Sequence, residues 1–225
     1  MTAYSRRLSP RSLARVIARL ATVALATVVL VGCSTAGQAP GTAGSAAPGS
    51  STSAAPSTSD GAGHLETRLK AISDAVDRWR AAGDLATARR AAEEARNLIV
   101  GPKGPLYGDA DRDGAVAGAS EIGLLPGLAG EAGLATAAAG VCVERDVLGG
   151  SWADPAARWA KLEAAISAWT PSNNTFPAFP SHPQRVIGWA TLTLAAADLA
   201  TAHEYGGHAR LHADIALRAL TDCAG

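Results

Sequence analysis

The chain has 225 residues, a length that suits one domain of ordinary size or two small ones, and it carries 20 basic and 20 acidic side chains. The five charged residues before Cys33 are all arginines, so the rest of the chain has 15 basic and 20 acidic groups and a net charge of −5. This acidic balance gives nucleic-acid binding no electrostatic support, and we expect no nucleic-acid partner. Alanine dominates, and strand-favouring runs are scarce after the N-terminal region, which indicates an all-α fold.

Residues 1–32 have the pattern of a secretory signal peptide. A basic segment precedes 12 uncharged residues, Leu20 to Val31, which are too few to cross a bilayer, since that takes about 20. The sequence Leu30-Val31-Gly32-Cys33 resembles the bacterial lipobox, whose Cys is acylated and becomes the first mature residue. This resemblance implies that the protein is lipid-anchored to the cell membrane through Cys33, on the extracytoplasmic side. An ordinary secretory signal is the alternative, and the export route, Sec or twin-arginine, stays open.

Residues 33–63 come next. They consist of Cys33, the expected site of lipidation, and a segment made almost entirely of Ser, Thr, Ala, Gly and Pro. Such a segment has too little apolar surface to offset its ordering entropy, so we expect a disordered tether ahead of a helical domain at 64–225. After lipidation only Cys142 and Cys223 remain as a possible disulfide pair, which suits an oxidising compartment. Two separate buried thiols are the alternative.

Apolar residues at steps of three and four predict a bundle of five or six helices with one long Gly/Pro/Asp-rich loop at 101–130. The expected helices are a first one along the stripe Leu65–Trp79, a second capped by Asp84 and running through Ile99, a third around Leu134–Leu148, a fourth from Asp154-Pro155 to Trp169, a fifth and most buried one at Val186–Ala197, and a final one at about Gly207–Cys223. The first two should pair antiparallel. Glu93 and Glu94 are expected on a solvated face of the second helix.

The sharpest motif in the long loop is Asp109-Ala-Asp111-Arg-Asp113-Gly114. It resembles the start of the calcium loop of EF-hand and dockerin-like proteins, where carboxylates at positions one, three and five converge on the ion. By that resemblance the Ala115 carbonyl comes next, whereas the closing carboxylate, Glu121, stands one residue late. We expect a looser Ca²⁺-stabilised loop, with a solvated turn that holds no metal as the alternative.

Residues at about 92–130 also resemble, over some 40 residues, a segment of uncharacterised extracytoplasmic bacterial helical proteins. Two stretches carry the resemblance, Asn97-Leu98-Ile99-Val100-Gly101 and Gly104-Pro105-Leu106-Tyr107-Gly108 before the Asp motif. Those proteins often carry His in the helix ahead of the Asn, where this chain has Ala91 and Glu94.

A second group of candidate ligands, Glu204, His208 and His212, lies near the C-terminus. Residues four apart on a helix can share a metal ion, but Glu204 joins only if the helix passes through Gly206-Gly207, which costs about 1 kcal/mol for each glycine. We therefore expect the helix to start after this pair. Half-buried histidines bonded to their neighbours are the alternative to a metal site.

Motifs for a serine hydrolase, phosphate-binding loop, haem or redox dithiol are missing from the sequence, and no organic cofactor is indicated. The pattern favours a non-enzymatic, lipid-anchored binding or scaffolding module with an unknown protein or small ligand as partner. The alternatives are a metal-handling protein or metal-dependent hydrolase built on Glu204, His208 and His212, and a small-solute carrier.

Overall fold

A computed structural model describes residues 58–138, 140–172 and 179–222, all within one compact unit, Thr52–Gly225. The helices are α1 (Thr58–Ala81), α2 (Leu85–Val100), α3 (Leu134–Ala137), the π-helical η1 (Val143–Leu148), α4 (Pro155–Ser167), α5 (His182–Leu194) and α6 (Leu199–Asp222). The described residues contain no strand, so the predicted all-α bundle is confirmed, with seven helices, two of them short. The signal peptide, Cys33, the tether up to residue 57 and Cys223 lie outside the described residues.

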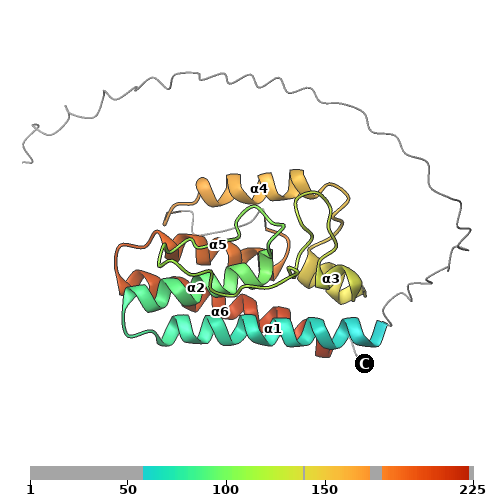
Figure 1. The fold of residues 1–225 in the computed structure, drawn as a ribbon, viewed down its shortest axis with the longest axis horizontal. Coiled ribbons are helices and arrows are strands. Elements are labelled where there is room, and N and C mark those ends of the chain that lie inside the picture. The colour runs from blue at the N-terminus through green and yellow to red at the C-terminus, as the bar shows by residue number, and fades with distance from the viewer. Residues whose placement is uncertain (1–57, 139, 173–178, 223–225) are drawn as a thin grey trace, which may run out of the picture. The chain divides into compact units, whose positions relative to one another are not determined.

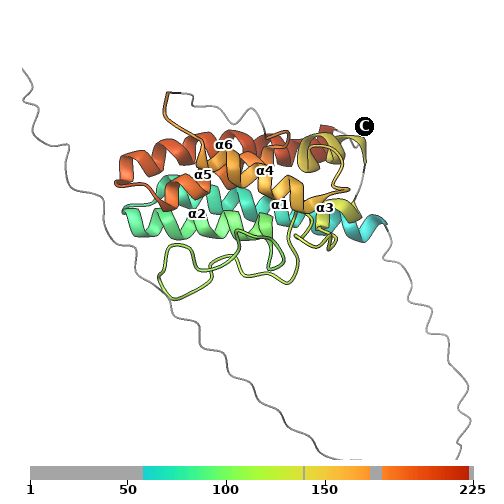
Figure 2. The same cartoon turned by 90° about the horizontal axis from the view of Figure 1, so that it is seen from above.

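The helices α1, α2, α5 and α6 pack side by side, and α4 lies against α5 (Figures 1 and 2). The antiparallel pairing of α1 and α2 that the sequence predicts is confirmed (Figure 1). Asp84 caps α2 as expected, because its carboxylate accepts the Thr87 N–H at 2.8 Å. None of the described helices is long and apolar enough to cross a membrane.

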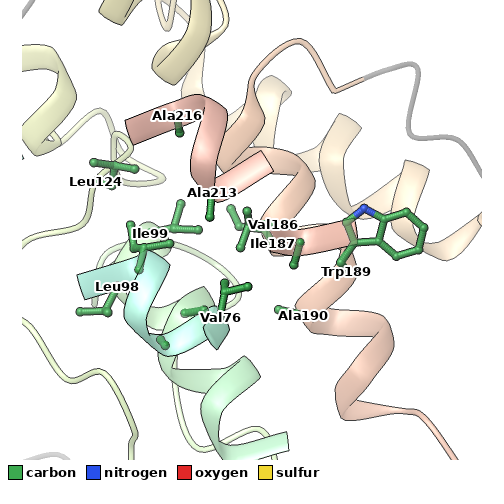
Figure 3. Packing of buried hydrophobic residues seen from close by; sticks show 14 of the residues in the cluster. Val76, Leu98, Ile99, Leu124, Val186, Ile187, Trp189, Ala190, Ala213 and Ala216 are labelled. Carbon is green, nitrogen blue, oxygen red and sulfur yellow. The ribbon is translucent and has the colours of Figure 1, made fainter. Parts of the chain in front are cut away.

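The core forms where these helices meet. Val76 of α1 and Ile99 of α2 face Val186 and Ile187 of α5 (Figure 3), and all four side chains are fully buried or nearly so. Alanines fill much of the remaining interface, which lets the helix backbones approach closely. Trp79, one of the largest fully buried side chains among the described residues, donates from Nε1 to the Ala202 carbonyl of α6 at 2.8 Å.

Two predicted boundaries are wrong in an informative way. The final helix does not start after Gly206-Gly207 but at Leu199, after the capping residue Asp198, whose carboxylate accepts the Thr201 N–H at 2.8 Å. Gly206 packs closely in this helix, since a Cβ there would come within 3.2 Å of the Trp79 Nε1, whereas a Cβ on Gly207 would meet nothing within 4 Å. The expected helix at 134–148 is instead split into α3 and η1.

The first helix also begins earlier than the predicted domain boundary, at Thr58 rather than after residue 63. The helical domain therefore begins before residue 64, the predicted boundary.

The long loop between α2 and α3 lies along the side of α2 that faces away from α6 (Figure 2). The part of the loop that leads back toward α3 is attached to the end of α2, because the Leu125 N–H donates to the Ile99 carbonyl at 3.1 Å. Gly101, with φ of 70°, and Gly123 pack backbone to backbone, and a Cβ on Gly101 would lie 2.3 Å from the Gly123 nitrogen. Leu125 is 1% exposed, so the returning end of the loop is packed against the bundle.

Candidate metal centre

The long loop folds around a buried carboxylate, Glu93 of α2, which has no exposed surface. One carboxylate oxygen, Oε2, accepts the N–H groups of Ala110 and Asp111, the second at 3.0 Å, and Oε1 accepts the Ala117 N–H at 2.8 Å. The expectation of a solvated Glu93 is therefore wrong. Its neighbour Glu94 is half-buried and pairs with Arg78 of α1 at 2.7 Å.

Asn97, one helical turn after Glu93, holds the two ends of the same turn of chain. Its Nδ2 donates to the carbonyls of Gly108 at 3.1 Å and Ala117 at 2.8 Å, and its Oδ1 accepts the Gly108 N–H at 3.2 Å. Asn97 is itself fully buried. Two side chains of α2 thus fix residues 108–117 through backbone groups alone.

Within this turn the aspartates organise the backbone. Asp109 accepts the Asp113 N–H on one oxygen at 3.1 Å and the Gly114 N–H on the other at 3.0 Å, while Asp111 also accepts from the Asp113 N–H at 3.0 Å. The Asp113 carboxylate accepts the Ala115 N–H at 2.9 Å. Arg112, between Asp111 and Asp113, takes a left-handed φ of 66° to close the turn.

Three carboxylates converge in the folded turn. Glu93, Asp109 and Asp111 each offer one oxygen, and these oxygens lie within 4.8 Å of one another. Burial raises the pKa of Asp111, and the negative charges of Glu93, Asp113 and Asp109 raise it further. A cation among these oxygens would relieve that repulsion, so the group can hold a metal ion.

The sequence predicted only part of this group. Asp109 and Asp111 belong to it, whereas Asp113 makes an ion pair with Arg90 at 3.2 Å, and Glu121 is exposed and outside the group. Ala115 takes part in the turn through its N–H. Glu93 was missed because the motif is read along the loop and its third carboxylate comes from the preceding helix. The only local signal was the four-residue spacing of Glu93 and Asn97, which puts two polar side chains on one helix face.

Solvent reaches the acidic turn through a pocket of about 210 Å³ beside the first turns of α2. Its lining includes Arg89, Arg90, Asp111 and Asp113, so basic and acidic side chains both border it. The pocket gives an ion or a small polar molecule access to Asp111 without opening the bundle.

The second predicted group, Glu204, His208 and His212, does not form a site with three ligands in the described part of the chain. Glu204 is exposed, and the His208 ring stacks on Trp189 at a centroid distance of 4.4 Å. His212 instead faces His182 of α5, with their Nδ1 atoms 3.1 Å apart. The α6 register places His208 and His212 toward α5, while Glu204 points to solvent.

Cys142 is half-buried at the start of η1, and its predicted partner, Cys223, lies outside the described residues. The disulfide therefore stays a prediction.

Comparison with known proteins identifies no relative. No family model matches the chain, and neither a curated protein nor a solved structure does. The chemistry of the site is therefore inferred from its own geometry.

Proposed function

We propose that this protein is a lipid-anchored, extracytoplasmic helical module that binds or scaffolds a partner, and that Ca²⁺ stabilises its long loop. The resemblance of Leu30 to Cys33 to a lipobox supports the anchor. A disulfide between Cys142 and Cys223 belongs to the same proposal, because it suits an oxidising compartment. The acidic balance after Cys33 supports a partner other than nucleic acid.

The observation that carries the calcium proposal is the convergence of Glu93, Asp109 and Asp111 within 4.8 Å. All three offer oxygen, the ligand atom that hard cations prefer, and none offers nitrogen or sulfur. The turn is irregular and partly open to solvent, which suits the variable coordination of Ca²⁺ better than the strict octahedron of Mg²⁺. Because Glu93 is in the buried face of α2, an ion bound here stabilises loop and bundle together.

We expect calcium to raise the melting temperature of the metal-free protein. Binding to the folded state alone, at a hundredfold excess over the dissociation constant, adds about 2.7 kcal/mol to the free energy of unfolding. For a domain of this size that corresponds to about 5–10 °C, measured by differential scanning calorimetry, and excess chelator should reverse it. Magnesium should give a smaller shift.

Two variants make the calcium test specific. Asp111→Asn removes a charge from the group and should abolish the shift, whereas Glu121→Gln removes the exposed carboxylate outside it and should leave the shift unchanged. A shift lost in both variants would place the ion in the sequence-predicted loop, which needs Glu121 as well as Asp111, and a shift kept in Asp111→Asn would contradict both sites. A melting temperature indifferent to calcium and chelator in the unmodified protein would end the proposal.

The anchor is tested separately, by Cys33→Ser. Without the thiol no thioether-linked lipid can form, so we expect the variant to accumulate as an unprocessed precursor or to leave the membrane fraction. Membrane fractionation and intact mass measurement distinguish these fates, with Cys142→Ser as the matched control that should stay membrane-bound. An unmodified protein whose mass shows no acyl chains would contradict the anchor and leave the calcium proposal intact.

A further inference from the structure

A pair of imidazoles, His182 and His212, bridges α5 and α6. His182 is the first residue of α5 and His212 lies in the second half of α6. Their Nδ1 atoms are 3.1 Å apart, with ring centroids at 5.3 Å and the ring planes inclined by 37°. Within the described part of the chain, each is the other's only hydrogen-bonding partner.

We propose that His182 and His212 form a binding site for a divalent transition metal such as Zn²⁺. A tetrahedral zinc ion with Zn–N bonds of about 2.0–2.1 Å places two ligand nitrogens about 3.3–3.4 Å apart. The observed 3.1 Å differs from that separation by only about 0.3 Å, which small ring rotations can supply. Both side chains are half-buried, so the metal can keep water in its remaining positions.

Charged groups of both signs lie around the two imidazoles. Burial lowers the pKa of His212 to about 4, helped by the charge of Arg185 and by the neighbouring histidines. Burial and Arg185 also lower the pKa of His182, whereas Asp146 of η1 acts in the opposite direction. Arg185 repels a cation and Asp146 attracts one, so these charges partly cancel at the site.

A third nitrogen ligand is available one turn earlier on α6. His208 precedes His212 by four residues, the spacing at which two helical side chains reach one ion. Its ring now stacks on Trp189, and no hydrogen bond of its nitrogens is found among the described residues. Rotation of the His208 ring away from Trp189 would bring a third imidazole toward the metal. The site would then offer three nitrogen ligands rather than two.

The same 3.1 Å also fits a hydrogen bond in which one imidazole donates from Nδ1 and the other accepts. The experiment is therefore a Zn²⁺ titration of the full-length chain without a histidine tag, followed by calorimetry and by nitrogen-15 NMR of the imidazoles. We expect one zinc per chain, with the resonances of His182 and His212 shifting together. Shifts confined to other histidines, or no binding below millimolar zinc, would leave the pair as a hydrogen bond and overturn the proposal.

Variants test the same site in a second way. His212→Asn and His182→Asn should each weaken zinc binding at least 10-fold, a loss of the size that altered metal sites commonly show. His64→Asn, which removes an exposed imidazole of α1, is the matched control and should bind zinc normally. Equal zinc affinity in His64→Asn and His212→Asn would overturn the proposal. If a variant does not fold, the zinc titration of the unmodified chain decides whether the site exists.

The zinc and calcium sites are also separable. Asp111→Asn should lose the calcium shift and keep zinc binding, because its carboxylate belongs to the other site. Zinc binding that disappears in Asp111→Asn would show that the ion sits among the carboxylates and would overturn the imidazole site.

Discussion

Replacing Glu93 by Gln is expected to lower the free energy of unfolding by about 2–4 kcal/mol, because a buried carboxylate that accepts three backbone N–H groups becomes an amide with one acceptor oxygen. The amide NH₂ must then face backbone N–H groups of the loop, such as that of Ala117, and leaves them without an acceptor. Hydrogen bonds to a charged group contribute about 1.5–3 kcal/mol each, and an unsatisfied buried donor costs about 1–3 kcal/mol. Urea unfolding in chelator measures the change without any contribution from bound metal.

Glu94→Gln is the matched control, since it makes the same chemical change at the adjacent residue. Glu94 pairs with Arg78, a partly exposed ion pair that should contribute no more than about 1 kcal/mol. Amide hydrogen exchange adds a local test, because Glu93→Gln should speed exchange at Ala110 and Ala117 and Glu94→Gln should not. Equal losses of stability in the two variants would contradict the role we assign to Glu93.

Trp79→Ala should be the most destabilising single substitution in the helical core, with a loss of about 3–5 kcal/mol. The Trp79 side chain is fully buried between α1 and α6, and its removal leaves a cavity beside Gly206 that the neighbouring helices cannot easily close. The indole also donates to the Ala202 carbonyl at 2.8 Å. Trp79→Phe keeps most of the packing and loses that hydrogen bond, so it should be intermediate.

Trp152→Ala provides the comparison at a half-buried tryptophan. Trp152 packs edge-on against Trp159 at 5.4 Å and lies under the Arg158 guanidinium at 4.5 Å, but part of its ring faces solvent. We expect about 1–2 kcal/mol, because less apolar surface returns to water. Chemical denaturation of both variants checks the order, and a Trp152→Ala loss as large as that of Trp79→Ala would contradict it.

Local signals predicted most of the helices. The stripe from Leu65 to Trp79 and the caps Asp84 and Asp154 mark α1, α2 and α4, because periodicity and capping depend on residues within a few positions of one another. The path of α6 could not be predicted in the same way. Its passage through Gly206 depends on the Trp79 side chain, which is more than a hundred residues away in sequence.

In the candidate site, too, only the features that depend on nearby residues could be predicted. The alternating spacing of Asp109 and Asp111 predicted that they would converge, since this depends only on the turn itself. The participation of Glu93 depends on the loop folding back along α2, and nothing in the loop sequence specifies that path. A charged residue in a helix is ordinarily solvated. The residue type of Glu93 therefore predicted an exposed side chain, although Glu93 holds the turn together.

The attachment of the loop to α2 also determines how the bundle can come apart. Glu93 and Asn97 have no exposed surface, and their polar atoms are satisfied by backbone groups of residues 108–117. If this segment detached, α2 would keep a carboxylate and an amide in its buried face without partners, and that face also packs near the core. A proteolytic nick between Asp109 and Ala117 should therefore destabilise the bundle as well as the loop, because α2 packs against both α1 and α5.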